Sequence, residues 1–275
     1  MSSQAVAGQP APGERRYPLA LALGGGCIRA FAHVGVIKAL EAGGIRPDLI
    51  VGTSAGGMVG ALYAAGLNGR RLETAANSLT WDVLQELRPS KFGVYSLEPL
   101  RRLVNRETGG KTIERFPTRF AVVATDLRTG QATALDQGEP GLAVVASSSV
   151  PGLVRPTTIG GREYIDGGVV SPVPIRVARA LGADIVVGID VSYRPEEAVL
   201  NNAVDVALQA FSIATRHLGR DELAEADVVI APSIGTLDHA NLGNNPALIA
   251  AGERAAVGAL PEIRALLARR AARKS

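Results

Sequence analysis

Short apolar segments alternate along the chain with longer segments in which apolar residues recur at helical spacing or alanine predominates. The short runs have the length of strands, and the longer segments have the length of helices. The strands predicted from this pattern are Leu19–Leu23, Leu49–Val51, Arg119–Thr125, Ala132–Leu135, Asp184–Val191 and Val228–Ile230. The helices predicted are Phe31–Ala42, Ser54–Ala65, Leu97–Asn105, Val173–Leu181, Ala203–His217, Pro246–Ala255 and Pro261–Arg273.

The order of these elements predicts the fold class. Strands separated by helices of about 10–15 residues need crossover connections, which make neighbouring strands parallel and place helices on both faces of the sheet. No internal repeat divides the chain, and no linker rich in Pro, Gly or Ser does so. We therefore expect a single α/β domain over residues 17–275, with three layers, α/β/α, around a mostly parallel central sheet.

The first 16 residues differ in composition from the rest of the chain. They are rich in Ala, Gln, Pro and Gly, which predicts a flexible tail over residues 1–16. The apolar run Tyr17–Leu23 follows two arginines, as in a secretory signal, but a glycine run and not a cleavage site comes after it. We interpret this run as a buried strand. No uninterrupted apolar run reaches the roughly 18 residues of a membrane-spanning helix.

Composition narrows the function classes. Hydrophobic residues make up 47% of the 275, which is enough for a sizeable core and excludes a largely disordered chain. The 29 Lys and Arg exceed the 26 Asp and Glu by only three, so we expect no nucleic-acid partner. A single cysteine excludes a disulfide framework and a cysteine-based zinc site, and favours a cytoplasmic location. Because no EF-hand, zinc or P-loop spacing occurs, we expect neither a metal nor a cofactor.

A glycine-rich turn, Gly24–Ala30, joins the first predicted strand to the first predicted helix. Its glycines allow main-chain N–H groups to point into a concavity at a helix N-terminus, where peptide dipoles favour negative charge. Such a turn can bind a phosphate or the oxyanion of a tetrahedral intermediate. Gly24 and Gly26 also fit a dinucleotide fingerprint, but Ala30 or Phe31 occupies the place of its last glycine.

The pentapeptide Gly52–Gly56 has the form Gly-x-Ser-x-Gly and lies between an apolar strand and a helix rich in Ala and Gly. A nucleophilic serine of this kind stands on a sharp, strained turn, so the residues two before and two after it must be nearly free of side chain. Gly52 and Gly56 meet this demand around Ser54. The following helix N-terminus favours developing negative charge. This context predicts Ser54 as a catalytic nucleophile.

A serine hydroxyl needs a base to accept its proton. The chain has three histidines, and in the chain order of an α/β-hydrolase only His217 and His239 could serve as that base. His217 ends a helical stretch beside a glycine and is interpreted as a helix-terminal cation. His239 lies in a polar loop, and His33 precedes the serine and is interpreted as a packing residue.

Asp166 is the stronger candidate for the base. It follows a predicted strand, Glu163–Ile165, and precedes Gly167 and Gly168, so its carboxylate stands at a strand end with little side chain beside it. Open α/β sheets place their sites at the carboxyl ends of strands. An ordinary Asp-Gly turn has the same sequence, but together with the two earlier motifs this carboxylate favours a catalytic role.

These three motifs, in this order, resemble the patatin-like phospholipase family, and the resemblance covers roughly residues 18–215. Gly24–Ala30 resembles the oxyanion loop of the family, Gly52–Gly56 its nucleophile elbow, and Asp166–Gly168 its Asp-Gly-Gly/Ala motif. Two further segments are similar to the family. Ala30–Leu40 resembles its first helix, and Ala146–Gly152 resembles the stretch before the Asp motif. The chain departs from the family at Ala30, where the loop usually closes on Gly, and at Cys27, where plant members carry Gly.

The resemblance implies a patatin-like acyl hydrolase domain in which Ser54 and Asp166 form a dyad without histidine. It implies that a phospholipid or lysophospholipid ester is cleaved through an acyl-enzyme, with no cofactor. The main-chain N–H groups of Gly25, Gly26 and Cys27 would hold the oxyanion.

Other segments bear on the lipid substrate. Arg29 would anchor the glycine loop or meet a phosphate head group. The apolar segments Met58–Leu67 and Val144–Val154 are expected either to line an acyl slot or to pack in the core. The basic, amphipathic segment Pro261–Lys274 could touch an anionic membrane surface transiently, or pack its apolar side against the protein.

Two alternatives stay open from the residues alone. The first is an α/β-hydrolase esterase with a triad of Ser54, a later Asp and His239. The second is a module that binds a phosphate or nucleotide through Gly24–Arg29 without catalysis. Against it, the position about 20 residues on holds Gly43 and Gly44 in place of a ribose-binding acid.

Overall fold

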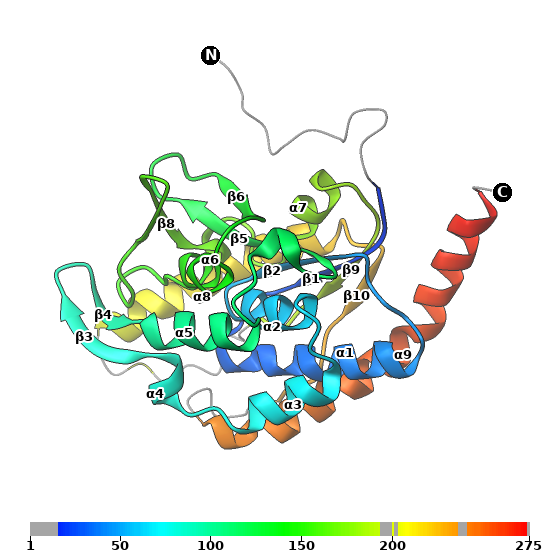
Figure 1. Ribbon diagram of the computed structural model, residues 1–275, viewed down its shortest axis with the longest axis horizontal. Helices are drawn as coiled ribbons and strands as arrows, with labels where there is room; N and C mark the ends of the chain where they lie inside the picture. Colours follow the sequence, from blue (N-terminus) through cyan, green and yellow to red (C-terminus); the bar gives the residue numbers. More distant parts are fainter. Residues whose placement is uncertain (1–15, 193–199, 201–202, 236–240, 274–275) are drawn as a thin grey trace, which may run out of the picture.

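The computed structural model describes residues 16–192, 200, 203–235 and 241–273. The predicted tail lies outside this part of the chain except for Arg16, and so does His239. A mostly parallel central sheet carries helices on both faces, which confirms the predicted α/β class (Figure 1).

Five strands form the parallel part of the sheet, in the order β10-β9-β1-β2-β5. They are β1 (Tyr17–Leu23), β2 (Leu49–Thr53), β5 (Arg119–Asp126), β9 (Ala183–Ile189) and β10 (Val228–Ile230). Three short strands extend the sheet through antiparallel pairs: β6 and β8 with β5, and β7 with β8. These are β6 (Ala132–Leu135), β7 (Thr157–Ile159) and β8 (Arg162–Asp166).

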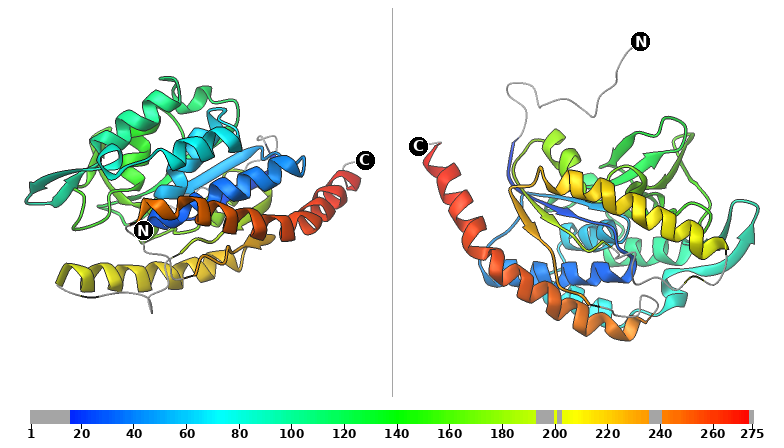
Figure 2. Two further views of the ribbon diagram at one scale, coloured as in Figure 1. Left: turned by 90° about the horizontal axis from the view of Figure 1, so that it is seen from below. Right: turned by 180° about the vertical axis from the view of Figure 1, so that it is seen from behind.

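The helices lie in two unequal layers (Figures 1 and 2). The larger layer holds α1 (Ala32–Ala42), α2 (Ala55–Ala64), α3 (Gly69–Asn77), α4 (Trp81–Leu84), α5 (Glu98–Glu107), α6 (Pro140–Ser147) and α9 (Asn245–Ala272). The opposite layer holds α7 (Ile175–Ala180) and α8 (Ala203–Leu223).

Both faces of the sheet are buried, which explains why its strands read as continuous apolar runs. Successive side chains of a strand point to opposite faces. In β1, Leu19, Leu21 and Leu23 therefore join the large core beneath α1 and α2, whereas Ala20 and Ala22 join the smaller core beneath α7. The small side chains on the second face allow α7 to approach the sheet closely.

The pattern did not predict α3, α4, α6 or a hairpin of two strands, β3 (Glu86–Ser90) and β4 (Gly93–Ser96). In the hairpin almost every residue from Leu87 to Phe92 is exposed, so no alternation of buried and exposed positions marks its first strand. The hairpin pairs outside the central sheet, and its contacts come from residues far along the chain.

The prediction of two C-terminal helices is wrong, because α9 continues through Pro261 as one helix (Figure 2). Proline removes one main-chain hydrogen bond and usually ends a helix. Here Ala256 and Ile263, on either side of Pro261, are both fully buried, so tertiary packing holds the two halves in line.

The apolar side of the C-terminal segment packs against the protein. Ile263 is buried, Leu266 and Leu267 pack on the large core, and Arg270 forms an ion pair with Asp184 at 2.5 Å. The structure therefore supports the packing interpretation of this segment, and its contact with a membrane stays a prediction. Among the described residues, no helix is both long and apolar enough to span a bilayer.

Candidate active site

The strand-to-helix turn at Ser54 is strained and tightly packed. Ser54 has φ +53° and ψ −125°, a conformation that side-chain-bearing residues rarely adopt. A Cβ on Gly52 would lie 2.6 Å from Gly57 Cα, and one on Gly56 would lie 2.4 Å from the Leu23 carbonyl oxygen. Any side chain at either position would collide with main chain, so the two glycines permit the turn that lifts the Ser54 hydroxyl above the sheet.

Two hydroxyl groups fix the backbone of this turn from below. The Ser54 N–H donates to Ser147 Oγ at 2.7 Å, and Ser147 Oγ donates in turn to the Val123 carbonyl at 2.5 Å. Thr53 Oγ1 donates to the Ser171 carbonyl at 2.8 Å. Ser147 and Thr53 are fully buried, so both contacts are shielded from water. The sequence analysis did not predict a role for Ser147, although it lies in the family-like segment before Asp166.

The strand register places Asp166 next to Ser54. On β5, Val122 and Val123 pair with β2 on one edge and with β6 on the other. Ala124 then pairs with both β6 and Asp166, so β8 takes over the edge that β2 leaves after Thr53. The residue after Thr53 is Ser54, and the two candidate residues therefore meet where one strand replaces another.

Burial changes the acid–base behaviour of Asp166. The residue is only 3% exposed, and this desolvation raises the pKa of its carboxyl from its ordinary value near 3.8 to about 6. Hydrogen bonds from the Gly168 N–H, at 2.7 Å, and from the Ser54 hydroxyl act in the opposite direction, because both stabilise the carboxylate. The result is a carboxylate that is ionised at neutral pH and a stronger base than an exposed aspartate.

The backbone holds Asp166 from both sides. Its N–H donates to the Ser149 carbonyl at 2.9 Å, and its carbonyl accepts from Thr125 Oγ1 at 2.8 Å. A Cβ on Gly167 would lie 2.1 Å from the Val123 carbonyl oxygen, so the residue after Asp166 has to be glycine. The Asp166 backbone is thus fixed by the loop after α6 on one side and by a side-chain hydroxyl of β5 on the other.

The glycine loop lies beside Ser54. A Cβ on Gly25 would be 3.4 Å from Ser54 Cβ. The N–H groups of Gly24 and Gly25 are engaged, however, with the carbonyls of Ile189 at 3.1 Å and Pro172 at 3.0 Å. The structure therefore does not support Gly25 as an oxyanion donor, and its N–H instead fixes the loop to the segment after Asp166.

Gly26 and Cys27 keep N–H groups that have no acceptor among the described residues. A short 3₁₀ helix, η1 (Cys27–Phe31), begins here, so these amides stand at its N-terminus. Cys27 has φ +49°, which turns the chain sharply at the start of the helix. Desolvation and the Asp166 carboxylate both raise the pKa of the Cys27 thiol, although the residue keeps exposed surface, so the thiol stays neutral.

Arg29 is buried, at 4% exposed. It lines a small polar cavity on the α8 side of the loop together with Asp190, Arg216 and Arg220. This placement fits the predicted role as an anchor of the loop.

The histidines have other surroundings. His33 is fully buried, and burial lowers the pKa of its ring to about 4, so the ring is neutral. Its Nε2–H therefore donates to the Gly24 carbonyl at 2.8 Å and supports the loop from the core. His217 lies exposed on α8. Neither of these two described histidines has a hydrogen bond to Ser54 or Asp166.

Glu222, on α8, is a buried carboxyl that the sequence analysis missed. It accepts from Ser171 Oγ at 2.8 Å and from the Val173 N–H at 3.3 Å. Burial raises the pKa of Glu222 to about 7. The segment it holds supplies the carbonyls of Ser171 and Pro172, which accept from Thr53 and Gly25, so Glu222 braces both sides of the site.

An apolar cavity of about 410 Å³ opens between α2, α3, α4 and α5. Met58 lines it one helical turn after Ser54, to whose carbonyl its N–H donates at 3.2 Å. Its other apolar lining residues include Phe31, Leu62, Leu72, Val83 and Leu103. The segment around Met58 thus faces a cavity, whereas Val144 and Val154 pack in the core. Among the described residues, no three His, Cys, Asp or Glu side chains gather in a way that could hold a metal ion.

The site combines a serine on a strand-to-helix elbow with a buried aspartate at the neighbouring strand end. A glycine loop lies beside them and offers two main-chain N–H groups. These features together define an α/β protein with a serine nucleophile site. The chain belongs to the patatin-like phospholipase family, whose model matches residues 21–179. That match contains all three motifs.

Curated relatives share this region. An uncharacterized NTE family protein of Mycobacterium tuberculosis is 33% identical over 176 residues, which are 63% of this chain and 49% of that one. The human patatin-like phospholipase domain-containing protein 6 is 34% identical over 187 residues, 65% of this chain and 14% of that one. Lysophospholipase NTE1 of Yarrowia lipolytica is 29% identical over 235 residues, 81% of this chain and 16% of that one. The chain thus spans half the length of these relatives or less.

A solved structure has the same fold. The crystal structure of VipD from Legionella pneumophila superposes with a TM-score of 0.58 and 14% sequence identity, over 93% of this chain and 67% of that one. At this identity the likeness concerns the fold alone.

Proposed function

We propose that this protein hydrolyses carboxylic esters of lipids, with Ser54 as the nucleophile and Asp166 as the base. The observation that carries the proposal is the strand register, which sets the Asp166 carboxylate against the Ser54 hydroxyl. Family membership and the lysophospholipase named among the relatives support a phospholipid or lysophospholipid substrate. The cytoplasmic location expected from the sequence stays a prediction.

The first half of the reaction forms an acyl-enzyme. Ser54 Oγ attacks the ester carbonyl carbon while Asp166 accepts the hydroxyl proton, and the carbonyl oxygen becomes an oxyanion. The N–H groups of Gly26 and Cys27 would hold this oxyanion, and each such donor is worth roughly 3–4 kcal/mol in the transition state. The tetrahedral intermediate then collapses, Asp166 returns the proton to the leaving alcohol, and the acyl group stays on Ser54.

The second half releases the fatty acid. A water molecule attacks the acyl carbonyl while Asp166 accepts its proton, and the same two amides hold the second oxyanion. Collapse of this intermediate breaks the bond to Ser54 Oγ, which recovers its proton from Asp166. The pKa of about 6 suits this double role, because the group accepts and returns a proton near neutral pH.

The apolar cavity beside Met58 suits the acyl chain. Met58, one helical turn after Ser54, is among its lining residues, and we propose that an acyl chain bound between α2, α3, α4 and α5 extends its carbonyl toward Ser54. Apolar burial of this kind adds about 0.8 kcal/mol per methylene group.

Turnover of a lysophospholipid and of a short soluble ester tests the proposal. Ser54→Ala and Asp166→Asn are both expected to abolish release of fatty acid from either substrate. The matched control is the double change His217→Gln with His239→Gln, which should keep most of the activity. Loss of turnover in that double variant would favour the triad, and unchanged turnover in Asp166→Asn would contradict the dyad.

A non-catalytic phosphate or nucleotide module is tested in the same preparations. Covalent labelling of Ser54 by a fluorophosphonate supports the enzyme, because it requires an activated hydroxyl. A rise in melting temperature with added nucleotide, without labelling, would support the binding module.

A further inference from the structure

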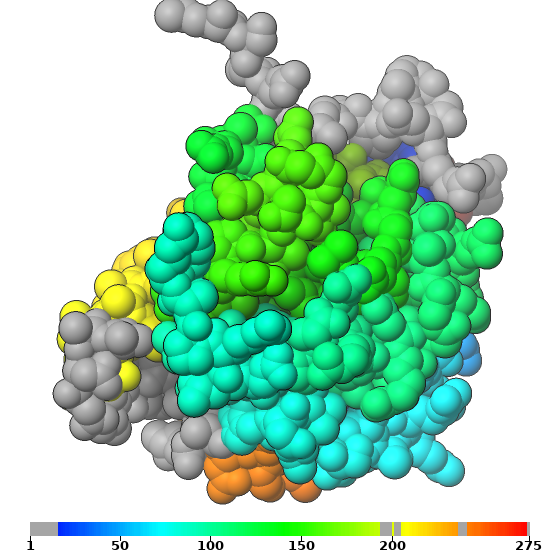
Figure 3. Space-filling model, turned by 60° about the vertical axis from the view of Figure 1, so that its left-hand side comes forward, coloured from blue at the N-terminus to red at the C-terminus, as the bar shows by residue number. Residues whose placement is uncertain are grey.

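The β3–β4 hairpin carries three exposed apolar side chains: Phe92 in its turn, Val94 just after the turn, and Leu87 near its base. Leu87 is 70% exposed, Phe92 61% and Val94 38%. Figure 1 shows the hairpin projecting from the body of the protein, and Figure 3 shows the side of the molecule on which it lies. Apolar side chains that are exposed together on a projecting element mark a surface that contacts another molecule or a membrane.

Cations lie among these apolar residues. Lys91 Nζ sits 4.8 Å above the centre of the Phe92 ring, and Arg88 is 75% exposed beside Glu86, with which it forms only a long ion pair of 3.9 Å. Arg155, exposed in the adjoining loop, adds a third cation. Basic side chains next to exposed Leu and Phe are suited to an interface between water and an anionic lipid surface.

The hairpin is joined to the candidate site. The N–H groups of Val94 and Tyr95 both donate to the Leu153 carbonyl, at 2.8 and 2.9 Å. Leu153 lies in the same loop as Ser149, whose carbonyl accepts from the Asp166 N–H. At the other end of the hairpin, Val83 of α4 lines the apolar cavity and lies three residues before β3. The hairpin therefore connects the loop that holds Asp166 to the cavity proposed for the acyl chain.

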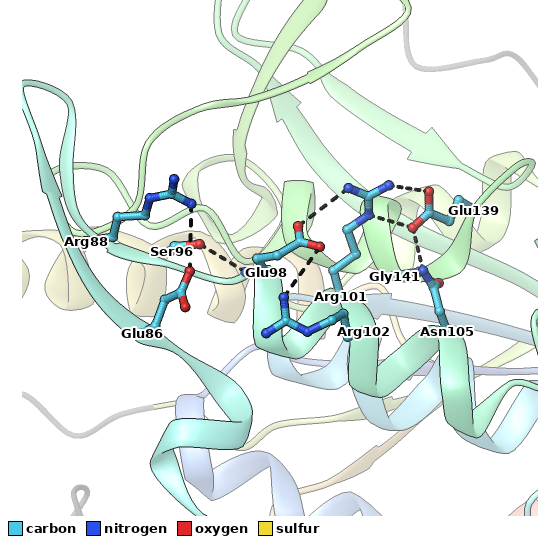
Figure 4. A network of polar contacts seen from close by, with 9 residues as sticks. All are labelled: Glu86, Arg88, Ser96, Glu98, Arg101, Arg102, Asn105, Glu139 and Gly141. Carbon is cyan, nitrogen blue, oxygen red and sulfur yellow. Dashed lines mark hydrogen bonds and ion pairs between the residues drawn. The ribbon is translucent and has the colours of Figure 1, made fainter.

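The base of the hairpin is also held rigidly (Figure 4). Ser96 Oγ accepts from the Glu98 N–H at 3.2 Å, which ties β4 to the start of α5. Arg101 of α5 then donates two hydrogen bonds to Glu139, at 2.6 and 2.7 Å, just before α6 begins. Since α6 carries Ser147, the hairpin, α5 and the support behind Ser54 form one connected unit.

We propose that the β3–β4 hairpin inserts its exposed apolar side chains into an anionic phospholipid surface and so sets the cavity and Ser54 against the membrane. The inference rests on the proposed lipid-ester function, because the lipid surface is where such a substrate is found. Leu87, Phe92 and Val94 would enter the acyl boundary, while Arg88, Lys91 and Arg155 would meet the phosphate groups.

Binding is measured in the Ser54→Ala protein, so the result does not depend on catalysis. The probes are vesicles of phosphatidylcholine alone and vesicles that also contain phosphatidylglycerol, separated from free protein by sedimentation. Changing Leu87, Phe92 and Val94 together to Ser should weaken binding to the anionic vesicles at least about tenfold. The matched control is Val257→Ser, an apolar residue 55% exposed on α9, which should bind as before.

Two further sets of variants test the proposal if the triple change disturbs folding. Arg88→Glu with Lys91→Glu should abolish the preference for anionic vesicles, whereas Arg254→Glu, on α9, should not. With Trp81 replaced by Phe in both proteins, the fluorescence of Phe92→Trp should be quenched by brominated lipid and that of Val257→Trp should not. Equal binding of hairpin and control variants would overturn the proposal, and so would a hairpin-dependent shift to a dimer without vesicles. A variant that loses turnover but still binds vesicles would instead bear on the proposed catalytic function and not on membrane binding.

Discussion

The site around Ser54 and the β3–β4 hairpin are built in opposite ways. The site is buried, and each of its groups is fixed by contacts from several strands and helices, as when Ser147 joins Ser54 to Val123. The hairpin is exposed and is attached through the main-chain hydrogen bonds of Val94 and Tyr95 to Leu153. This difference indicates that the buried site carries out the reaction, whereas the hairpin governs access to esters in a membrane. Changes in the buried site should affect every ester, whereas changes in the hairpin should affect only esters held in a membrane.

Asp166→Asn should produce the largest effect. We expect at least a roughly 1,000-fold loss of kcat, because the base is removed while the size of the side chain is kept. At high pH, in contrast, Asp166→Asn should be more stable to unfolding than the native protein. Holding an ionised carboxyl with its pKa raised to about 6 costs the folded state about 3 kcal/mol, which the neutral amide avoids.

The melting temperatures of Asp166→Asn and of the native protein test this expected difference in stability. The folded pKa of Asp166 lies above its unfolded value, so the protonated form favours the folded state below pH 4 and this advantage is lost as pH rises through about 6. The melting temperature of Asp166→Asn relative to the native protein should therefore rise between pH 5 and pH 8. A fall over that range would show that Asp166 is not held as an unfavourable buried charge.

Ser147→Ala should have the next largest effect. It leaves the Ser54 N–H without its acceptor inside the protein, which costs about 1–3 kcal/mol of stability. We expect kcat to fall roughly 10- to 100-fold with little change in KM, because the elbow relaxes while the acyl cavity is untouched. Thr129→Ala is the control, since its hydroxyl is exposed, accepts from the Gln131 N–H in a turn and lies outside the lining of the acyl cavity. Equal effects from the two variants would exclude a positioning role for Ser147.

Glu222→Gln should have a smaller effect. Its two carboxyl oxygens accept from Ser171 and Val173, and an amide can accept at only one of these points. We expect a lower melting temperature and a roughly three- to tenfold lower kcat, because the segment that holds Gly25 and Thr53 loosens. Glu225→Gln, an exposed neighbour paired with Arg176, should change neither quantity.

The smallest effect should come from the hairpin when the substrate is soluble. The Leu87, Phe92 and Val94 variant should keep its turnover of a short soluble ester within about twofold, since a few exposed side chains far from the chemistry contribute little to it. Its turnover of esters in anionic vesicles should fall with its binding. Equal losses on both substrates would show that the hairpin shapes the site itself.

The sequence predicted the parts of this structure that local pattern determines. The Gly-x-Ser-x-Gly elbow needs only five neighbouring residues, and a carboxylate followed by two glycines marks a strand end. The central strands were readable because both faces of the sheet are buried, so each strand is a continuous apolar run. The match to the family model confirms the family resemblance that these motifs carry.

Contacts between distant residues were beyond such patterns. Ser147 and Glu222 act through partners 93 and 51 residues away, and nothing in their own neighbours marks them. The engaged N–H of Gly25 depends on where Pro172 falls after the chain folds back. Pro261 predicted a helix end, but burial of Ala256 and Ile263 on both sides of it prevailed over the local preference.

The rate at which a fluorophosphonate labels Ser54, measured across pH and located by peptide mass spectrometry, tests the central claim most directly. We predict that the rate rises through a pKa of about 6, is unchanged in the His217→Gln, His239→Gln protein, and is lost in Asp166→Asn. Labelling of Asp166→Asn at the native rate, or loss of labelling in the histidine variant, would contradict it.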